Sequence, residues 1–162
     1  MLDVNVILDM VLDRRPHSTT ARALWAAAER KEIEVVVPAH GVTTVFYVAA
    51  RERGAGFARR IMSDLVLVPA IAPVDGATLH RALALGWADF EAAVCAAAAE
   101  AASCDLLVTR DARGFKDSPV LVVDPVTALS LLRGGAPSDR AGERPARAYR
   151  ARDSGRAKPR RR

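Results

Sequence analysis

Short apolar runs alternate with longer stretches of helical periodicity along the first 133 residues. Runs rich in valine and leucine predict strands at residues 2–8, 34–38, 106–109 and 120–123. Apolar residues at helical spacing predict helices, the first capped by Ser18 or Thr19, at residues 17–30, 42–53, 56–65, 76–85, 89–102 and 124–132. Because such helices connect parallel strands and cover the sheet, we expect an α/β fold, a three-layer sandwich with a short parallel central sheet flanked by helices.

The composition suits a single cytoplasmic domain. With 51% hydrophobic residues in a chain of 162, a core large enough to fold without disulfides is available. The two cysteines, Cys95 and Cys104, lack the paired spacing of a zinc or redox site, so we expect reduced thiols. No apolar stretch reaches the roughly 20 residues that span a bilayer, and the N-terminal run carries Asp3 and Asp9 rather than a basic leader. We therefore expect neither export nor a membrane span.

The positive charge is concentrated at the C-terminal end. Residues 134–162 contain ten basic and three acidic side chains, a charge of +7, so residues 1–133 carry −2 of the total of +5. This segment has almost no large apolar residue, which predicts a disordered tail after a domain of residues 1–133. The tail could bind phosphate backbones, contact an acidic protein partner or aid solubility.

Carboxylates occur where the predicted strands meet one edge of the sheet. Asp3 lies in the first predicted strand, and Asp111 follows the strand that ends at Thr109. Functional groups of parallel sheets gather beyond the carboxyl ends of the strands, so we expect these two acids to converge. Asp89, a natural N-cap, and Glu91 begin the helix that leads into the later strand. Several carboxylates at one rim suit Mg²⁺ or Mn²⁺, which prefer oxygen ligands.

Four segments resemble motifs of the PIN domain family, in the family's order. The segments are DVNVILD at residues 3–9, AHGVTTVFY at 39–47, DFEAAV at 89–94 and TRDARGF at 109–115. Each motif is weak alone, but the ordered set is specific, and the resemblance extends over residues 1–133. It implies a metal-dependent endoribonuclease, similar to the VapC toxins of toxin–antitoxin pairs. It also implies RNA as substrate, an antitoxin protein as partner and a homodimer.

The resemblance assigns roles to particular side chains. Asp3, Asp89 and Asp111 would be catalytic residues and would bind Mg²⁺ or Mn²⁺. Asn5 and Thr109 would orient the metal shell, and Asp9 would hold a water molecule or an arginine behind it. Further candidates are two supporting residues of the site and three basic residues that would contact RNA: Thr44, Glu91, Arg110, Arg113 and Lys116.

The chain departs from the family pattern at three acidic positions. Thr44, Ala92 and Gly114 stand where the family usually has glutamate, aspartate and aspartate. Residues three apart share a helix face, so Asp89 is a better substitute for an acid at position 92 than Glu91, which lies about 100° away. The alternative is therefore a catalytically weakened or inactive PIN-like module that binds RNA or protein. A small-molecule enzyme of similar architecture is a third hypothesis, although no glycine-rich phosphate loop supports it.

Other chemically capable side chains are assigned structural roles. The histidines His17, His40 and His80 have no evident acidic or serine partner, so we interpret them as surface or capping residues. The aromatic residues Trp25, Phe46 and Tyr47 are not interleaved with a basic cluster, so we assign them to core or interface faces rather than to base stacking.

Overall fold

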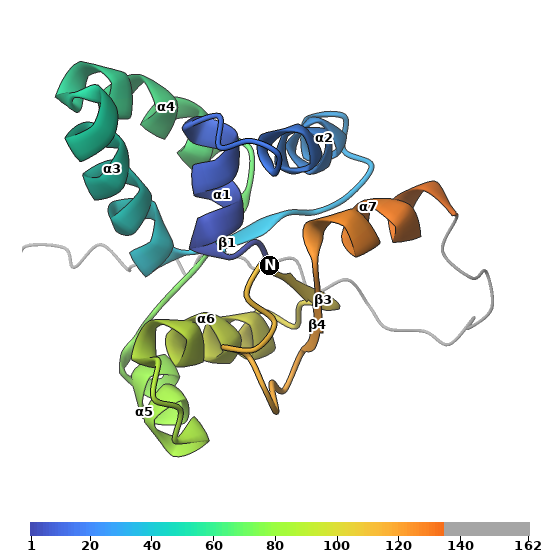
Figure 1. Ribbon diagram of the computed structural model, residues 1–162. Coiled ribbons are helices and arrows are strands. Elements are labelled where there is room, and N and C mark those ends of the chain that lie inside the picture. The colour runs from blue at the N-terminus through green and yellow to red at the C-terminus, as the bar shows by residue number, and fades with distance from the viewer. Residues whose placement is uncertain (135–162) are drawn as a thin grey trace, which may run out of the picture.

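The computed structural model describes residues 1–134, which form seven helices and four strands (Figure 1). In chain order these are α1 (Val4–Val11), α2 (Ser18–Glu29), β1 (Val36–Pro38), α3 (Ala39–Arg53), α4 (Ala55–Leu67), β2 (Ala70–Ala72), α5 (Gly76–Leu85), α6 (Phe90–Ala101), β3 (Leu106–Val108), β4 (Leu121–Val123) and α7 (Pro125–Arg133). The predicted tail, apart from Gly134, lies outside the described residues.

The strands form two parallel pairs joined through the N-terminus. β1 pairs with β2, and β3 pairs with β4. Between them, the Leu2 amide donates to the Val36 carbonyl at 2.8 Å, and Leu2 forms a parallel bridge with Val108. The spatial order is therefore β2, β1, the N-terminal residues, β3 and β4. This arrangement confirms the predicted parallel α/β architecture.

Helices cover both sides of these strands, as Figure 1 shows with α1 to α4 and α7 above and α5 and α6 below. Val37 and Val108 belong to the core that contains α1, α2 and α3, whereas Ala72 and Leu107 belong to the core built on α6. Neighbouring strand residues point to opposite faces, so Leu107 and Val108 serve different cores. The two cores and the strands between them make the expected three layers.

The prediction of a strand at residues 2–8 is wrong. Only the first residues pair as a strand, and α1 begins at Val4 because the Asp3 carboxylate caps it, accepting a hydrogen bond from the Val4 amide at 2.7 Å. An apolar run of this length has no periodicity that separates a strand from a buried helix. The predicted cap of α2 is also wrong, because His17 occupies the N-cap position and makes no side-chain capping bond.

A helical hairpin made of α3 and α4 extends from the upper left of the molecule in Figure 1. Gly54 ends α3 and begins α4 with φ 86° and ψ 155°. Only glycine adopts this backbone conformation at little cost, so the sharp turn depends on it. The hairpin places the C-terminal end of α3 beside the N-terminal end of α4.

Helix α6 is buried along most of its length. Eight consecutive residues are buried: Ala92, Ala93, Val94, Cys95, Ala96, Ala97, Ala98 and Ala99. Small side chains allow the strands and α5 to approach the helix closely. Cys95 and Cys104 are free, as expected, and burial raises the pKa of the Cys95 thiol. Across residues 1–134, no single helix is long and apolar enough to cross a membrane; α5 and α6 qualify only together, as a pair bent by 118°.

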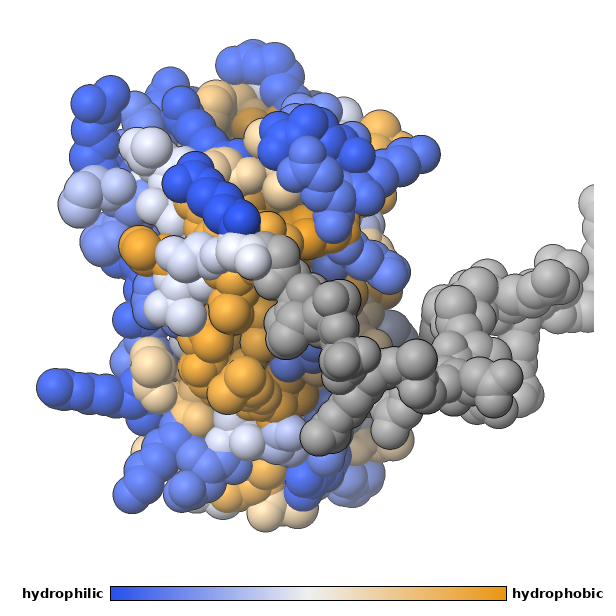
Figure 2. Space-filling view, turned by 90° about the vertical axis from the view of Figure 1, so that its right-hand side faces the viewer, coloured by the Kyte–Doolittle hydropathy of each residue, from blue (hydrophilic) through white to orange (hydrophobic). Residues whose placement is uncertain are grey.

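The edge of the sheet formed by β4 presents apolar surface. Figure 2 shows a hydrophobic band on the face that lies to the right in Figure 1, where β4 and α7 are placed. These two elements carry four large exposed apolar side chains, those of Leu121, Val126, Leu131 and Leu132. Contiguous apolar surface of this kind is typical of a face that contacts a partner.

Candidate functional site

A pocket of about 260 Å³ opens where the N-terminal ends of three helices meet. α1 contributes Asp3 and Asn5, α3 contributes Thr44, and α6 contributes Asp89, Glu91 and Ala92. The loop after β3 adds Asp111. The carboxyl ends of the strands and the positive ends of helix dipoles therefore surround one group of acids. Asp3, Asp89 and Asp111, which were predicted to converge, all line this one pocket.

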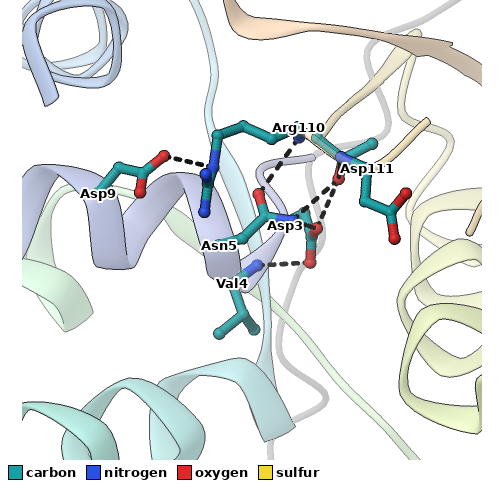
Figure 3. A network of polar contacts seen from close by, with 7 residues as sticks. Asp3, Val4, Asn5, Asp9, Arg110 and Asp111 are labelled. Atoms are coloured by element: carbon teal, nitrogen blue, oxygen red, sulfur yellow. Dashed lines mark hydrogen bonds and ion pairs between the residues drawn. The ribbon is translucent and has the colours of Figure 1, made fainter. Parts of the chain in front are cut away.

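Asp3 is held by three side-chain and backbone donors. Its Oδ1 accepts from the Val4 amide at 2.7 Å, and its Oδ2 accepts from the Thr109 hydroxyl at 2.7 Å. The Asn5 side-chain amide donates to the same Oδ2 and lies 3.1 Å from the Thr109 hydroxyl (Figure 3). This network joins the start of α1 to the end of β3, and it fixes the direction of the carboxylate.

The charge on Asp3 is costly in this position. Burial raises the pKa of its carboxyl, and the hydrogen bonds from Thr109 and Val4 oppose that effect. The negative charges of Glu91 and Asp89 raise this pKa further. Several negative charges close together destabilise a fold, so selection for stability alone would remove them. Such clusters are common at functional sites.

Asp111 is oriented by its own turn. Its amide donates to the Thr109 hydroxyl at 3.1 Å, and its Oδ1 accepts from the Gly114 amide at 3.2 Å. A Cβ atom added at Gly114 would lie 2.9 Å from Asp111 Oδ2, closer than side chains normally approach. Glycine at position 114 therefore leaves room for the Asp111 carboxylate in this orientation.

Asp89 and Glu91 belong to the first turn of α6. Asp89 is the N-cap, as predicted, and its Oδ1 accepts from the Ala92 amide at 3.0 Å. Glu91 Oε1 lies 3.4 Å from the Thr44 hydroxyl on α3. Each of these carboxylates thus has one oxygen engaged by the fold, and the structure gives the other oxygen no protein hydrogen bond among residues 1–134.

The donor set fits a hard divalent cation that keeps much of its water. All the polar groups facing the pocket are oxygen donors or an amide, as Mg²⁺ and Mn²⁺ prefer. Within the described part of the chain, however, no three Asp, Glu, His or Cys side chains are close enough to enclose one ion. Mg²⁺ commonly binds through one or two carboxylates and retains several waters, so the pocket suits a hydrated ion held by few direct protein ligands.

Asp9 is turned away from the pocket and pairs with an arginine. Its side chain is 1% exposed, and its Oδ2 lies 2.6 Å from Arg110 Nε. Figure 3 shows the Arg110 side chain extending away from Asp111 and toward Asp9 on α1. The Arg110 amide also donates to Asn5 Oδ1 at 3.3 Å. Burial raises the pKa of the Asp9 carboxyl, and the positive charge of Arg110 opposes this.

Several remaining side chains lie around this centre. Arg113 and Lys116 are exposed on the loop that carries Asp111. Leu8 and Phe115 form apolar walls of the pocket, a position that no sequence pattern indicated. His40, in the first turn of α3, has two buried ring nitrogens without a hydrogen-bond partner among residues 1–134, so it has neither the surface role nor the capping role that we expected. Burial lowers the pKa of its imidazole, while Glu91 opposes that shift.

The comparison with protein families agrees with this geometry. The family model described as PIN domain matches residues 1–113, more than two thirds of the chain and the whole of the pocket up to Asp111. Among curated proteins, none matches the chain. The acids that converge on one pocket and the matching family model lead to one conclusion: this chain belongs to the PIN domain family, whose members are generally nucleases.

Proposed function

We propose that this chain is a metal-dependent endoribonuclease that hydrolyses RNA phosphodiester bonds and acts as the VapC-like toxin of a toxin–antitoxin pair. The observation that supports the proposal best is the gathering of Asp3, Asp89, Glu91 and Asp111 around one pocket. Among residues 1–134, no basic side chain lines that pocket to offset their charge. Such a site repels a phosphate unless a cation is bound, which favours a metal-dependent reaction.

The proposed roles follow from the contacts of each side chain. Asp3 and Asp111 would hold Mg²⁺ or Mn²⁺ directly or through water, and Asp89 would complete the shell. The Thr109 hydroxyl and the Asn5 amide keep the Asp3 carboxylate facing the pocket. When bound, the cation would orient the scissile phosphate and lower the pKa of an attacking water.

The basic residues of the neighbouring loop would contact the RNA. Arg113 and Lys116 are exposed, and 33% of the Arg110 side chain remains accessible while its Nε faces Asp9. Arginine and lysine beside a carboxylate pocket would contact phosphates that flank the scissile bond. Glu91 and Thr44 would support the opposite wall.

The test is cleavage of RNA by the purified full chain with and without Mn²⁺. Asp3→Asn should remove metal-stimulated cleavage. Because this variant is purified in the same way as the wild type, any cleavage that it shows measures contaminating ribonuclease. Asp105→Asn is the matched control, because Asp105 is exposed at the other end of β3. Cleavage that persists at the wild-type rate in Asp3→Asn would refute the nuclease mechanism.

Ala92 and Thr44 favour a second candidate, a PIN module that binds RNA or protein with little or no catalysis. Ala92 lines the pocket at a position where the family usually has an aspartate. Thr44, which lies near Glu91, occupies a position where the family usually has a glutamate. The double variant Ala92→Asp and Thr44→Glu separates the two accounts. A large gain in cleavage would indicate a weakened enzyme, whereas metal-independent RNA binding without any gain would indicate a binding module.

Partners and location extend the same proposal. An antitoxin protein would be encoded beside this chain and bind it, and the chain would act on RNA in the cytoplasm. A second copy of the chain would cover the apolar band of β4 and α7 seen in Figure 2. Leu121→Glu should then shift the protein toward a monomer in sedimentation, and an unchanged dimer would place the interface elsewhere.

A further inference from the structure

The outer face of α3 leads away from the acidic pocket. His40, Thr44, Tyr47 and Arg51 follow one another at intervals of four, three and four residues, so they share one face of the helix. Thr44 lines the pocket, and Arg51 lies in the last turn of α3, about 10 Å further along the helix axis at 1.5 Å per residue. Tyr47 lies between them.

Tyr47 is unusually exposed for an aromatic residue. Its relative exposure is 64%, whereas Phe46, the next residue before it, is partly buried. An aromatic side chain on an exposed helix face leaves most of its ring accessible in the folded chain, so the ring is available to another molecule. Of the two predicted locations for Tyr47, a core face or an interface face, this exposure excludes the core.

The hairpin beyond Tyr47 carries excess positive charge. Arg51 and Arg53 end α3, and Arg59 and Arg60 lie in α4 across the Gly54 turn. None of these four arginines forms an ion pair with residues 1–134, and the neighbouring acid, Glu52, is engaged by Arg14 at 2.6 Å. Arg53 instead lies over the Phe57 ring, 4.6 Å from its centroid.

The sequence hides this juxtaposition because the four arginines follow the aromatic residue instead of alternating with it. The hairpin folds α4 back against α3, so all four arginines lie close to the Gly54 turn, at the end of α3 toward which the face of Thr44, Tyr47 and Arg51 leads. An exposed ring beside unpaired cations matches how proteins bind single-stranded nucleic acid, with bases stacked on aromatic side chains and phosphates held by basic ones.

We propose that this surface, formed by Tyr47, Arg51, Arg53, Arg59 and Arg60, binds single-stranded RNA next to the acidic pocket. This proposal rests on the proposed function in one respect: the bound RNA strand continues into the acidic pocket. Tyr47 stacks on a base, and the arginines hold the phosphates that follow. Because the pocket itself is acidic, this separate basic surface supplies the affinity that the pocket lacks.

Binding is measured without cleavage, by the fluorescence anisotropy of a short labelled single-stranded RNA with the full chain in EDTA. Tyr47→Ala should weaken binding by about 5- to 150-fold, the range for loss of one base–aromatic stack, and Tyr47→Phe should bind like the wild type. Leu83→Ala is the matched control, because Leu83 on α5 has the same relative exposure of 64%. Its affinity should not change.

The arginines are tested by the salt dependence of the same binding. Arg51→Gln should reduce the slope of log affinity against log salt by about 0.7, the value for one phosphate contact on a single strand. Arg133→Gln, in the last turn of α7, is the matched control and should leave the slope unchanged. The basic tail is present in every variant, so its contribution cancels.

Three results would overturn the inference: no binding of single-stranded RNA in EDTA, tighter binding of the corresponding duplex, or Tyr47→Ala changing the sedimentation of the protein but not its RNA affinity. The last result would assign Tyr47 to a contact between two copies. Failure of the nuclease proposal is distinct, because a protein that binds through Tyr47 but cleaves no RNA would keep the surface and lose only the catalysis.

Discussion

Arg110 reaches back from the loop after β3 to place its Nε 2.6 Å from the buried carboxylate of Asp9 on α1. The pair joins residues far apart in the sequence, and the Arg110 amide also donates to Asn5, which belongs to the network of Asp3 and Thr109. Because the Asp9 side chain is 1% exposed, its charge depends on this arginine for compensation. The pair therefore fixes the loop that carries Asp111.

Arg110→Gln should destabilise the fold by about 1–3 kcal/mol at neutral pH, less than for a fully buried pair because the arginine is partly exposed. Burial already raises the pKa of Asp9, so this carboxyl stays protonated to higher pH in the folded state than in the unfolded state. The stability of the fold therefore falls as the pH rises from the unfolded-state pKa of Asp9 through its folded-state pKa. Losing Arg110 raises this pKa further. Urea unfolding should therefore show that Arg110→Gln lowers the free energy of unfolding less at pH 5 than at pH 8.

The double variant Asp9→Asn and Arg110→Gln is the control for that prediction. It removes the buried charge together with its partner, so it should recover most of the lost stability and show no added pH dependence. An equal loss for Arg110→Gln at both pH values, with no recovery in the double variant, would mean that the ion pair does not support the loop.

Asp89 allows helix capping and charge to be separated. Asp89→Asn keeps an oxygen that can accept from the Ala92 amide, so the free energy of unfolding should change by less than about 0.5 kcal/mol. Asp89→Ala loses the cap and should cost about 1 kcal/mol. If Asp89 also binds the cation, both variants should reduce the stabilisation by Mn²⁺ measured by thermal unfolding. An Mn²⁺ effect that survives in Asp89→Asn would restrict this residue to capping.

Where local signals were strong, the sequence predicted the elements well. The apolar run that stops at Pro38 marks the end of β1. The Asp124-Pro125 pair marks the start of α7, and Asp124 caps that helix by accepting hydrogen bonds from the Val126 and Thr127 amides. Residues 2–8 were misassigned because the strand and the buried helix have the same apolar composition. β2 was missed, since Ala70–Ala72 lies between prolines and carries no strand pattern.

The site was predictable only in its outline. Parallel topology alone indicates that acids at strand ends converge, and Asp3 and Asp111 do lie on one pocket. The partner of Asp9, the contact between Gly114 and Asp111, and the exposure of Tyr47 each depend on packing between segments distant in sequence. No local sequence pattern encodes such contacts.

Ala92→Asp should strengthen cation binding. Position 92 lines the pocket in the first turn of α6, where the helix dipole favours an acid, although the variant adds a further negative charge near Asp3. Without metal, the variant should therefore be less stable than the wild type by about 1 kcal/mol. With Mn²⁺ it should gain more, up to about 2.7 kcal/mol once the ion reaches a hundred times its dissociation constant.

Ala88→Asp is the matched control, because Ala88 is exposed four residues earlier and does not line the pocket. It adds the same charge, so nonspecific attraction of Mn²⁺ would appear in both variants. Equal thermal shifts for Ala88→Asp and Ala92→Asp would contradict a cation site at the pocket.

Gly114→Ala should impair the site more than the fold. The new Cβ would lie 2.9 Å from Asp111 Oδ2, and the end of an exposed side chain can move aside, so unfolding should change by no more than about 1 kcal/mol. The displaced carboxylate should weaken Mn²⁺ stabilisation and metal-dependent cleavage together. Gly76→Ala is the control, because a Cβ there meets no atom within 4 Å. If Gly114→Ala keeps full Mn²⁺ stabilisation, the orientation of Asp111 set by its own turn does not matter for binding the ion.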